Sequence, residues 1–277
     1  MDKRELVNRS IDYIFQHLEE GLTIKEVANY FNFSEFYFSR LFKEVTGKSI
    51  YAFIKRLKID QSAIDIKLKP NKTITDIGLD YGYSSSNYSS VFRQHHRLSP
   101  TRFRKFIKIK SISNPFYPEK VEQFKNFADY DERIKIIFLN DIKVIHERIY
   151  GNYGELKGKW LQFLETYKDF IQDETLMIER FYDDPTISSQ NSCICDLCIT
   201  TNITDIKGNI AMIKGGKFVT YRFEGKIKDI FNTIQGIFLV WFPESGYEMG
   251  EKYGLNIYRK IDEANGYVIM DLCIPIK

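Results

Sequence analysis

The chain has 277 residues, of which 43% are hydrophobic and 15% aromatic, enough for two packed domains and too apolar for a disordered chain. The longest apolar runs, such as residues 236–242, are too short to cross a bilayer, and the N-terminal segment lacks the apolar region of a secretory signal. Four cysteines in a chain of this length do not form a disulfide framework. We therefore expect a cytoplasmic protein with no membrane partner.

Charge is divided unevenly along the chain. Residues 1–113 contain 20 Lys and Arg against 12 Asp and Glu, a net charge of +8, so the remainder carries −5 of the total +3. Residues 81–118 contain seven basic residues and no acidic one. This distribution predicts that only the first part of the chain meets a polyanion such as a nucleic acid. The alternative is an ordinary solvated charged helix.

The first 110 residues contain a sequence unit that recurs at an offset of fifty. The matched positions include Thr23-Ile24 with Thr73-Ile74, Phe31 with Tyr81, Ser34 with Ser84, Phe42 with Phe92 and Ser49 with Ser99. The apolar spacing within each copy is helical. We therefore predict two helix-turn-helix units, over about residues 23–46 and 73–96.

Capping and turn residues give the boundaries of these helices. In the first unit Thr23 and Glu26 have the spacing of a capping box, Asn32 suits a left-handed turn, and Ser34 begins a second helix that stops at Gly47.

The second unit repeats these signals, and further helices accompany the two units. Thr73 and Asp76 form the cap, Gly82 makes the turn, and Ser84 or Ser85 caps the next helix. A leading helix is expected over residues 6–20, and a helix over residues 51–68 joins the two units. Residues 1–110 are thus predicted to form an all-α domain.

The second helix of each unit has an apolar and a polar face. The inward positions are Phe38, Leu41, Phe42 and Val45 in the first unit, and Tyr88, Val91, Phe92 and His95 in the second. Small hydroxyl and amide side chains let a helix lie close to base edges, and Arg binds guanine or phosphate. The alternative is an indifferent solvated face. We predict that the outward side chains bind DNA: Phe36, Tyr37, Ser39, Arg40, Lys43, Ser85, Ser86, Asn87, Ser89, Ser90 and Arg93.

The segment DIGLDYGYSSSNYSSVFRQHHRLSPTRFRK, residues 76–105, gives a family resemblance. Together with the first unit it resembles the DNA-binding domain of AraC/XylS-type regulators over about residues 1–108. The resemblance implies that one chain places both recognition helices in successive major-groove faces of one side of a duplex, ~34 Å apart. The helix over residues 51–68 would set that spacing. Glu35 is acidic near the first recognition helix and would lessen contact there.

A linker follows, and after it a second domain with a different pattern of apolar residues. Residues 111–118, SISNPFYP, contain two prolines and no charge, which is typical of a linker. Residues 119–277 are predicted to form an α+β domain with a mostly antiparallel sheet. Strands are expected over 134–146, 177–182, 192–201, 208–223 and 267–275, and helices over 155–171 and 227–242.

Several motifs in this part occur in the order found in one family. They are RIYGNYG at 148–154, DDP at 183–185, GGKFVTYRFEG at 215–225 and WFPESGY at 241–247. Together they resemble the GyrI-like effector-binding domain over about residues 130–277. The resemblance implies two β-α-β-β units with a groove between them, which binds a small, often aromatic or cationic, molecule.

Flat aromatic side chains with polar tips suit such a groove, because they hold planar ligands and cations. The alternative is that these side chains belong to the core. Related domains have glutamate two residues before the tyrosine at 258, and Asn256 here disfavours both a strongly cationic ligand and hydrolase activity. The residues predicted to line the effector site are Tyr153, Trp160, Trp241, Tyr247, Asn256 and Tyr258.

We predict no catalytic residue, cofactor or metal site. Cys193, Cys195 and Cys198 offer three thiolates where zinc needs four ligands, and on a strand Cys198 faces away from the other two. His95-His96 lies in a DNA-binding helix, and Asp183-Asp184 precedes a proline turn. The sequence contains no glycine-rich phosphate loop.

These observations predict a sequence-specific DNA-binding transcription regulator, with activation as the expected mode. Its partners would be double-stranded promoter DNA, a small, aromatic effector and RNA polymerase. One alternative is a GyrI-like hydrolase or drug-sequestering protein. The other is a ligand-independent activator whose second domain binds only protein partners.

Overall fold

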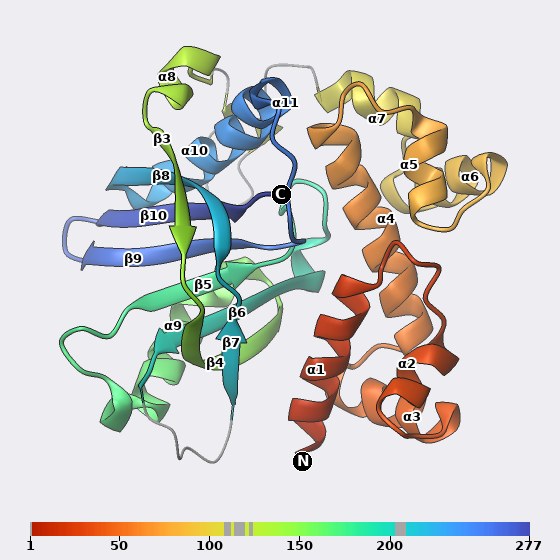
Figure 1. Ribbon diagram of the computed structural model, residues 1–277, viewed down its shortest axis with the longest axis horizontal. Helices are drawn as coiled ribbons and strands as arrows, with labels where there is room; N and C mark the ends of the chain where they lie inside the picture. The colour runs from red at the N-terminus through yellow and green to blue at the C-terminus, as the bar shows by residue number, and fades with distance from the viewer. Residues whose placement is uncertain (1, 108–111, 114–119, 122–123, 203–208) are drawn as a thin grey trace. The chain divides into compact units, whose positions relative to one another are not determined.

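A computed structural model describes residues 2–107, 112–113, 120–121, 124–202 and 209–277. The chain divides into two compact units, Met1–Ile109 and Lys110–Lys277 (Figure 1). In the described ranges, no helix combines the length and the apolar character needed to cross a membrane. The expected linker, residues 111–118, lies mostly outside the described residues. Of the linker residues, Ile112–Ser113 form strand β1, which pairs with β2 (Lys120–Val121) just after the linker.

The described residues of the first unit are helical, as predicted. The helices are α1 (Lys3–Gln16), α2 (Ile24–Tyr30), α3 (Glu35–Thr46), α4 (Ile50–Leu68), α5 (Ile74–Asp80), α6 (Ser85–His96) and α7 (Pro100–Ile107). The leading helix α1 ends at Gln16 rather than at Glu20, and α7 was not predicted. Gly21 ends the turn that follows α1, in the left-handed conformation.

The two helix-turn-helix units keep the offset of fifty residues in three dimensions. Helices α2 and α3 correspond to α5 and α6 at both ends of each helix. The turns pass through Asn32 and Gly82, with φ of 59° and 77°. The second helices end at Gly47 and Arg97, with φ of 72° and 62°. The predicted repeat and its turn chemistry are therefore confirmed.

Side-chain caps begin most of these helices. The Thr23 hydroxyl accepts a hydrogen bond from the Glu26 amide in a full capping box, and Ser34 caps α3 at the Tyr37 amide. Thr73 caps α5 in the same way. Ser84 occupies the cap position of α6 but its hydroxyl accepts no capping bond.

Helix α4 joins the two helix-turn-helix units through buried polar contacts as well as apolar ones. The Tyr88 hydroxyl donates to Ser62 Oγ at 3.0 Å, and the Tyr81 hydroxyl donates to Asp65 at 2.9 Å. Gly78 allows the Tyr88 ring to approach α5, since a Cβ there would lie 2.8 Å from Tyr88 Cγ. These contacts fix α6 against both α4 and α5.

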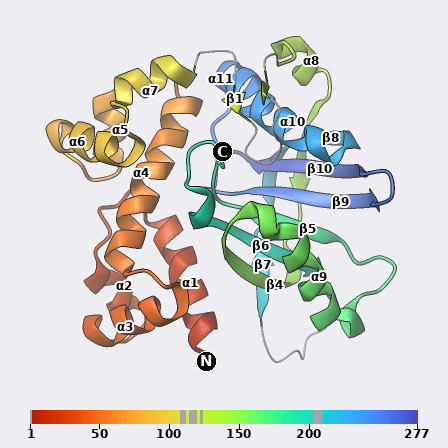
Figure 2. The same ribbon diagram turned by 180° about the vertical axis from the view of Figure 1, so that it is seen from behind.

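The second unit is built around an eight-stranded antiparallel sheet with helices, as predicted (Figures 1 and 2). Its strands after β2 are β3 (Ile134–Leu139), β4 (Ile142–Gly151), β5 (Met177–Phe181), β6 (Cys193–Thr200), β7 (Ile210–Ile213), β8 (Gly216–Lys226), β9 (Gly254–Asp262) and β10 (Tyr267–Pro275). Its helices are α8 (Phe127–Asp131), α9 (Leu156–Thr166), α10 (Ile230–Gly236), a π-helical turn η5 (Ile237–Trp241) and α11 (Phe242–Ser245), with short 3₁₀ turns at 153–155, 168–170, 190–192 and 227–229.

The strand order is β3-β8-β10-β9-β5-β6-β4-β7. It contains two β-α-β-β repeats, β4-α9-β5-β6 and β8-α10-β9-β10, which meet where β5 pairs with β9. The strand that precedes each repeat, β3 or β7, pairs with the other repeat, on β8 and β4 respectively. The predicted duplication is therefore present.

Several boundaries differ from those expected. The expected strand 134–146 is two strands separated by a turn, in which the Asp141 carboxylate accepts the Gly215 amide at 2.8 Å. The expected strand 208–223 is likewise β7 and β8, and both expected helices are interrupted by 3₁₀ or π turns. Strand β9 and helix α8 were not predicted.

Candidate functional site

The outward face of α3 and α6 is exposed as predicted. Phe36 is 80% exposed, which is unusual for a phenylalanine, and Tyr37 is 39% exposed. The inward residues of α3 and α6 include the fully buried Phe38, Phe42, Tyr88 and Phe92. Ser39 is half-buried, and the other predicted DNA-contacting residues are exposed: Arg40, Lys43, Ser85, Ser86, Asn87, Ser89, Ser90 and Arg93.

The exposed face of α6 includes a shallow open pocket at its C-terminal end. The lining residues are Ser89, Ser90, Arg93, Gln94, Arg97 and Ser99. Sequence reasoning missed Gln94 and Arg97 as part of this face. Arg97 adopts a left-handed conformation at the position where the first helix-turn-helix unit has Gly47. This conformation is unfavourable for a residue with a Cβ. The sequence does show that Arg97 stands at the repeat position of Gly47, and this difference could have drawn attention to Arg97.

The two recognition helices differ in local charge. Helix α6 carries no acidic residue, whereas α3 carries Glu35 and Glu44. Glu44 pairs with Lys3 of α1 at 2.8 Å, in an exposed contact. The surface of α6 is therefore the more favourable of the two for a polyanion.

His95 is less buried than expected for an inward residue. Its side chain is 35% exposed, and its Nε2 lies 2.9 Å from Asp60 Oδ1 on α4. The neighbouring His96 takes the packed position instead, with its ring against Phe92 and Phe103. Helical periodicity indicates that only one of the adjacent residues His95 and His96 packs in the core. Tertiary contacts, which the periodicity does not show, decide that it is His96.

A polar cluster in the second unit lies where the two β-α-β-β repeats meet. Glu179 of β5 is directly opposite Asn256 of β9 in the sheet register. Paired residues of antiparallel strands share a face, so the row Tyr221, Leu272, Asn256, Glu179, Leu197 lies on one side. Leu197 packs in the core under α9, and the opposite end of the row meets α8 through the Tyr130–Tyr221 ring contact. The cluster thus occupies the helix-covered face at the centre of the sheet.

Glu179 is the hub of this cluster. The Trp160 indole donates to Glu179 Oε1 at 2.8 Å, and the Asn256 amide donates to Oε2 at 2.9 Å. Tyr258 also hydrogen-bonds Glu179, and its ring meets Trp160 edge to face with centroids 6.3 Å apart. Burial, with the nearby Glu179 carboxylate, raises the pKa of the Tyr258 hydroxyl well above its usual value.

The sequence did not single out Glu179, although strand alternation from Met177 would have placed it on the α9 face. It is buried, with 6% exposure. Of the other predicted lining residues, Tyr153 packs on the same core under α9 and donates to the Ile194 carbonyl at 3.3 Å.

Trp241 and Tyr247 form a separate aromatic cluster. Trp241 is 2% exposed, and its indole donates to Asp131 of α8 at 2.8 Å. Its ring stacks with Tyr247 at 5.9 Å and Phe127 at 6.5 Å. In the structure described here, Trp241 therefore offers no free face to a ligand.

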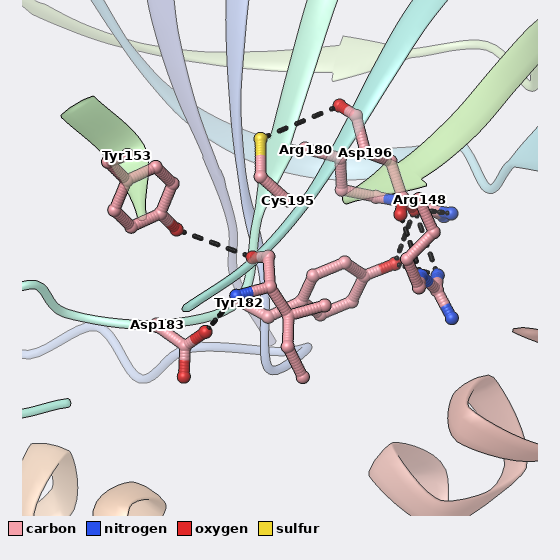
Figure 3. A network of polar contacts seen from close by, with 8 residues as sticks. Arg148, Tyr153, Arg180, Tyr182, Asp183, Cys195 and Asp196 are labelled. Carbon is pink, nitrogen blue, oxygen red and sulfur yellow. Dashed lines mark hydrogen bonds and ion pairs between the residues drawn. The ribbon is translucent and has the colours of Figure 1, made fainter. Parts of the chain in front are cut away.

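The other face of the sheet holds a buried ionic network (Figure 3). The Asp196 carboxylate accepts hydrogen bonds from Arg148 and Arg180, and Tyr182 donates to the same group. Burial alone would raise the pKa of Asp196, but the two guanidinium groups reverse this effect and lower it strongly. Asp183, next to this network, accepts the Ile194 amide.

The four cysteines are buried, and none of them forms a disulfide. Cys195 packs under α9, whereas Cys198 and Cys273 lie in the core of the opposite face. Burial raises the pKa of all three thiols, that of Cys273 to about 12, which disfavours the thiolate form that metal binding needs.

Comparisons with known proteins agree with this division. A helix-turn-helix domain family matches residues 27–105, and the GyrI-like small molecule binding domain family matches residues 133–277, more than half of the chain. An HTH-type transcriptional regulator of Staphylococcus aureus is 29% identical over 136 residues, which are 49% of this chain and 17% of that protein. The chain thus matches less than a fifth of the length of these staphylococcal relatives.

The TetD protein of transposon Tn10 from Escherichia coli is 30% identical over 94 residues, 34% of this chain and 67% of TetD. Among solved structures, the C-terminal domain of AraT from Geobacillus stearothermophilus covers 36% of this chain and 84% of its own, with 26% identity and a TM-score of 0.35. The EcmrR C-terminal domain covers 52% of this chain and 96% of its own, with 13% identity and a TM-score of 0.44. The first unit thus contains an AraC-type helix-turn-helix domain, and the chain belongs to the family of the GyrI-like small molecule binding domain.

Proposed function

We propose that the chain is a sequence-specific DNA-binding transcription regulator whose second unit binds a small cationic aromatic effector. The observation that supports DNA recognition is the pair of equivalent helices, α3 and α6, with exposed outward faces. A serine-rich face such as that of α6 can approach base edges closely, and Arg93 adds a contact to guanine or phosphate. Effector binding would then change DNA affinity or a contact with RNA polymerase.

An anisotropy titration of the full chain tests DNA recognition. The probes are duplexes that tile the DNA upstream of its own and adjacent genes, with scrambled duplexes as controls, at several salt concentrations. We expect one duplex to bind about 10³-fold or more tighter than its scramble, with affinity falling steeply as salt rises. Equal weak binding to every duplex would contradict sequence specificity, and no binding at low salt would reject the DNA-binding proposal.

The preference for a cation rests on Glu179. Its hydrogen-bond partners among the described residues, Trp160, Asn256 and Tyr258, are all uncharged. A buried carboxylate with only neutral partners attracts a cation, and the Trp and Tyr rings beside it favour a flat aromatic one. Glu179 therefore supplies from β5 the carboxylate that Asn256 does not supply from β9. This revises the expectation, based on Asn256, that a strongly cationic ligand is disfavoured.

Glu179→Gln should weaken binding of N-methylacridinium by about 10–100-fold, because a charge-assisted contact contributes roughly 1.5–3 kcal/mol. The substitution keeps the shape of the side chain. Among the described residues the buried Asn256 Oδ1 has no hydrogen-bond partner, so the amide of Asn256 can turn to accept a hydrogen bond from the amide that replaces the Glu179 carboxylate. Quenching of tryptophan fluorescence measures the affinity.

Neutral acridine is the matched control ligand, since it has the same ring system without the charge. Its affinity should change little in Glu179→Gln. A Trp241→Phe variant should keep the quenching, because the cluster contains Trp160 and not Trp241. Equal losses for the charged and the neutral ligand would contradict a charge-based role for Glu179.

We further propose that the second unit acts by binding rather than by catalysis. Related domains have glutamate at the position of Asn256, and the amide of Asn256 cannot act as a general base. Turnover of an activated ester by the full chain, lost in Glu179→Gln, would contradict this proposal and favour the hydrolase alternative.

A further inference from the structure

Two adjacent histidines of α6 converge on one carboxylate of α4. His95 Nε2 lies 2.9 Å from Asp60 Oδ1, and His96 Nε2 lies 3.7 Å from the same oxygen. One ligand atom from each of the three residues lies within 4.8 Å of the other two. The side chain of Asp60 is 1% exposed, so this carboxylate is deep in the first unit.

His96 is the least satisfied member of this group. Its side chain is 7% exposed, and its buried Nε2, 3.7 Å from Asp60 Oδ1, has no hydrogen-bond partner among the described residues. The ring also hydrogen-bonds the Ile59 backbone, a bond that Nδ1 must make because Nε2 has none. An imidazole whose Nδ1–H donates to a carbonyl carries a lone pair on Nε2, the usual state of a metal-binding histidine.

The surroundings keep His96 in this state. Its ring packs against Phe92 and Phe103, with centroids 4.6 and 5.5 Å apart. The lone pair of His96 Nε2 and the carboxylate of Asp60 are electron-rich groups that face each other, and a bound cation would bridge them.

We propose that Asp60, His95 and His96 bind one divalent transition-metal ion of the zinc class and thereby join α6 to α4. Two imidazoles and one carboxylate are ligands that Zn²⁺ accepts. With bonds of about 2.0–2.1 Å in a tetrahedral site, ligand atoms lie about 3.4 Å apart, so the His95–Asp60 pair opens and the His96–Asp60 pair closes by less than about 0.5 Å each. His95, with a side chain 35% exposed, provides the route to solvent and an open fourth position.

Arg56 supports this arrangement from the other side of the carboxylate. Its guanidinium donates to Asp60 Oδ2 at 3.2 Å, and the two histidines approach the other oxygen, Oδ1, at 2.9 and 3.7 Å. Carboxylates that bind metals are commonly oriented by such second contacts. Because the proposed ligands come from α4 and from the C-terminal end of the second recognition helix, the ion would stiffen the attachment of that helix.

Zn²⁺ titration of the full chain by calorimetry, starting from EDTA-treated protein, tests the proposal. We expect one site, and an unfolding temperature that rises with Zn²⁺ because the ion binds only the folded state. His95→Gln should weaken this binding at least about tenfold. His95 is partly exposed, so this variant should fold normally, and its unfolding temperature in EDTA verifies that.

His17→Gln is the matched control. His17 is also partly exposed and also lies beside a carboxylate, with Nδ1 2.7 Å from Glu20 Oε2, but it has no third ligand. This variant should bind Zn²⁺ like the wild type. Co²⁺ in place of Zn²⁺ should give visible ligand-field bands without sulfur charge-transfer bands. No Zn²⁺ binding, unchanged binding in His95→Gln, or sulfur charge-transfer bands from the cysteines would each overturn the proposal.

Discussion

Asp196→Asn should lower the free energy of unfolding of the second unit by about 3–5 kcal/mol, because it leaves two buried guanidinium groups without their carboxylate. Arg148 Nε lies 2.7 Å from Asp196 Oδ1, and Arg180 lies 2.6 Å from Oδ2. The side chains of Arg148 and Asp196 are fully buried, and that of Arg180 is 9% exposed. Water therefore cannot replace the lost charge.

Urea unfolding followed by tryptophan fluorescence measures this effect, since both tryptophans, Trp160 and Trp241, lie in the second unit. Asp141→Asn is the matched control. Asp141 also forms an ion pair, with Lys214 at 3.1 Å, but both side chains are exposed and such pairs contribute about 0–1 kcal/mol. Similar losses in the two variants would show that burial of the network is not what stabilises it.

The same network predicts how stability depends on pH. The folded pKa of Asp196 lies below that of an unfolded aspartate, which is about 3.9. The stabilisation is therefore present above about pH 4 and is lost as the pH falls below that value toward the folded pKa. In Asp196→Asn this part of the acid dependence should disappear, whereas Asp141→Asn should keep it.

The helix-turn-helix units could be predicted closely because their signals are local. A cap such as Thr23 with Glu26 and a left-handed turn residue such as Asn32 lie within a few residues of the bond or angle they determine. Because the sequence is duplicated, equivalent residues fifty positions later predict the same helix boundaries a second time. The exception is Arg97, where the second copy ends in a left-handed residue that is not glycine.

The Glu179 cluster, the proposed effector site, depends instead on contacts distant in sequence. Glu179 meets Asn256 only because β5 pairs with β9, 77 residues further along the chain. Neither strand periodicity nor composition specifies which strands become neighbours. The aromatic residues show the same limit: Trp160 and Trp241 look alike in sequence, yet one joins Glu179 and the other binds Asp131 of α8. Asp60 likewise meets His95 through tertiary packing of α4 on α6.

Arg93→Ala should weaken specific DNA binding by about 1–3 kcal/mol, or roughly 5–150-fold, and Arg40→Ala should weaken it less. Both residues are exposed on their recognition helices. The difference follows from their surroundings. Arg93 lies on a helix without acidic residues, in a pocket that also contains Arg97, whereas Arg40 shares α3 with Glu35 and Glu44. Anisotropy titrations on the duplex selected as above compare the variants with the wild type.

The salt dependence of binding and a control variant in the second unit distinguish recognition of a base by Arg93 from general electrostatic attraction to DNA. If Arg93 binds phosphate, its loss should weaken all duplexes alike and reduce the slope of log affinity against log salt by about 1. If it reads a base, the loss should fall mainly on the specific duplex. Lys157→Ala removes one equally positive, 77% exposed side chain from the second unit and should leave DNA affinity unchanged. An equal effect of Arg93→Ala and Lys157→Ala would mean that net charge, and not the face of α6, governs binding.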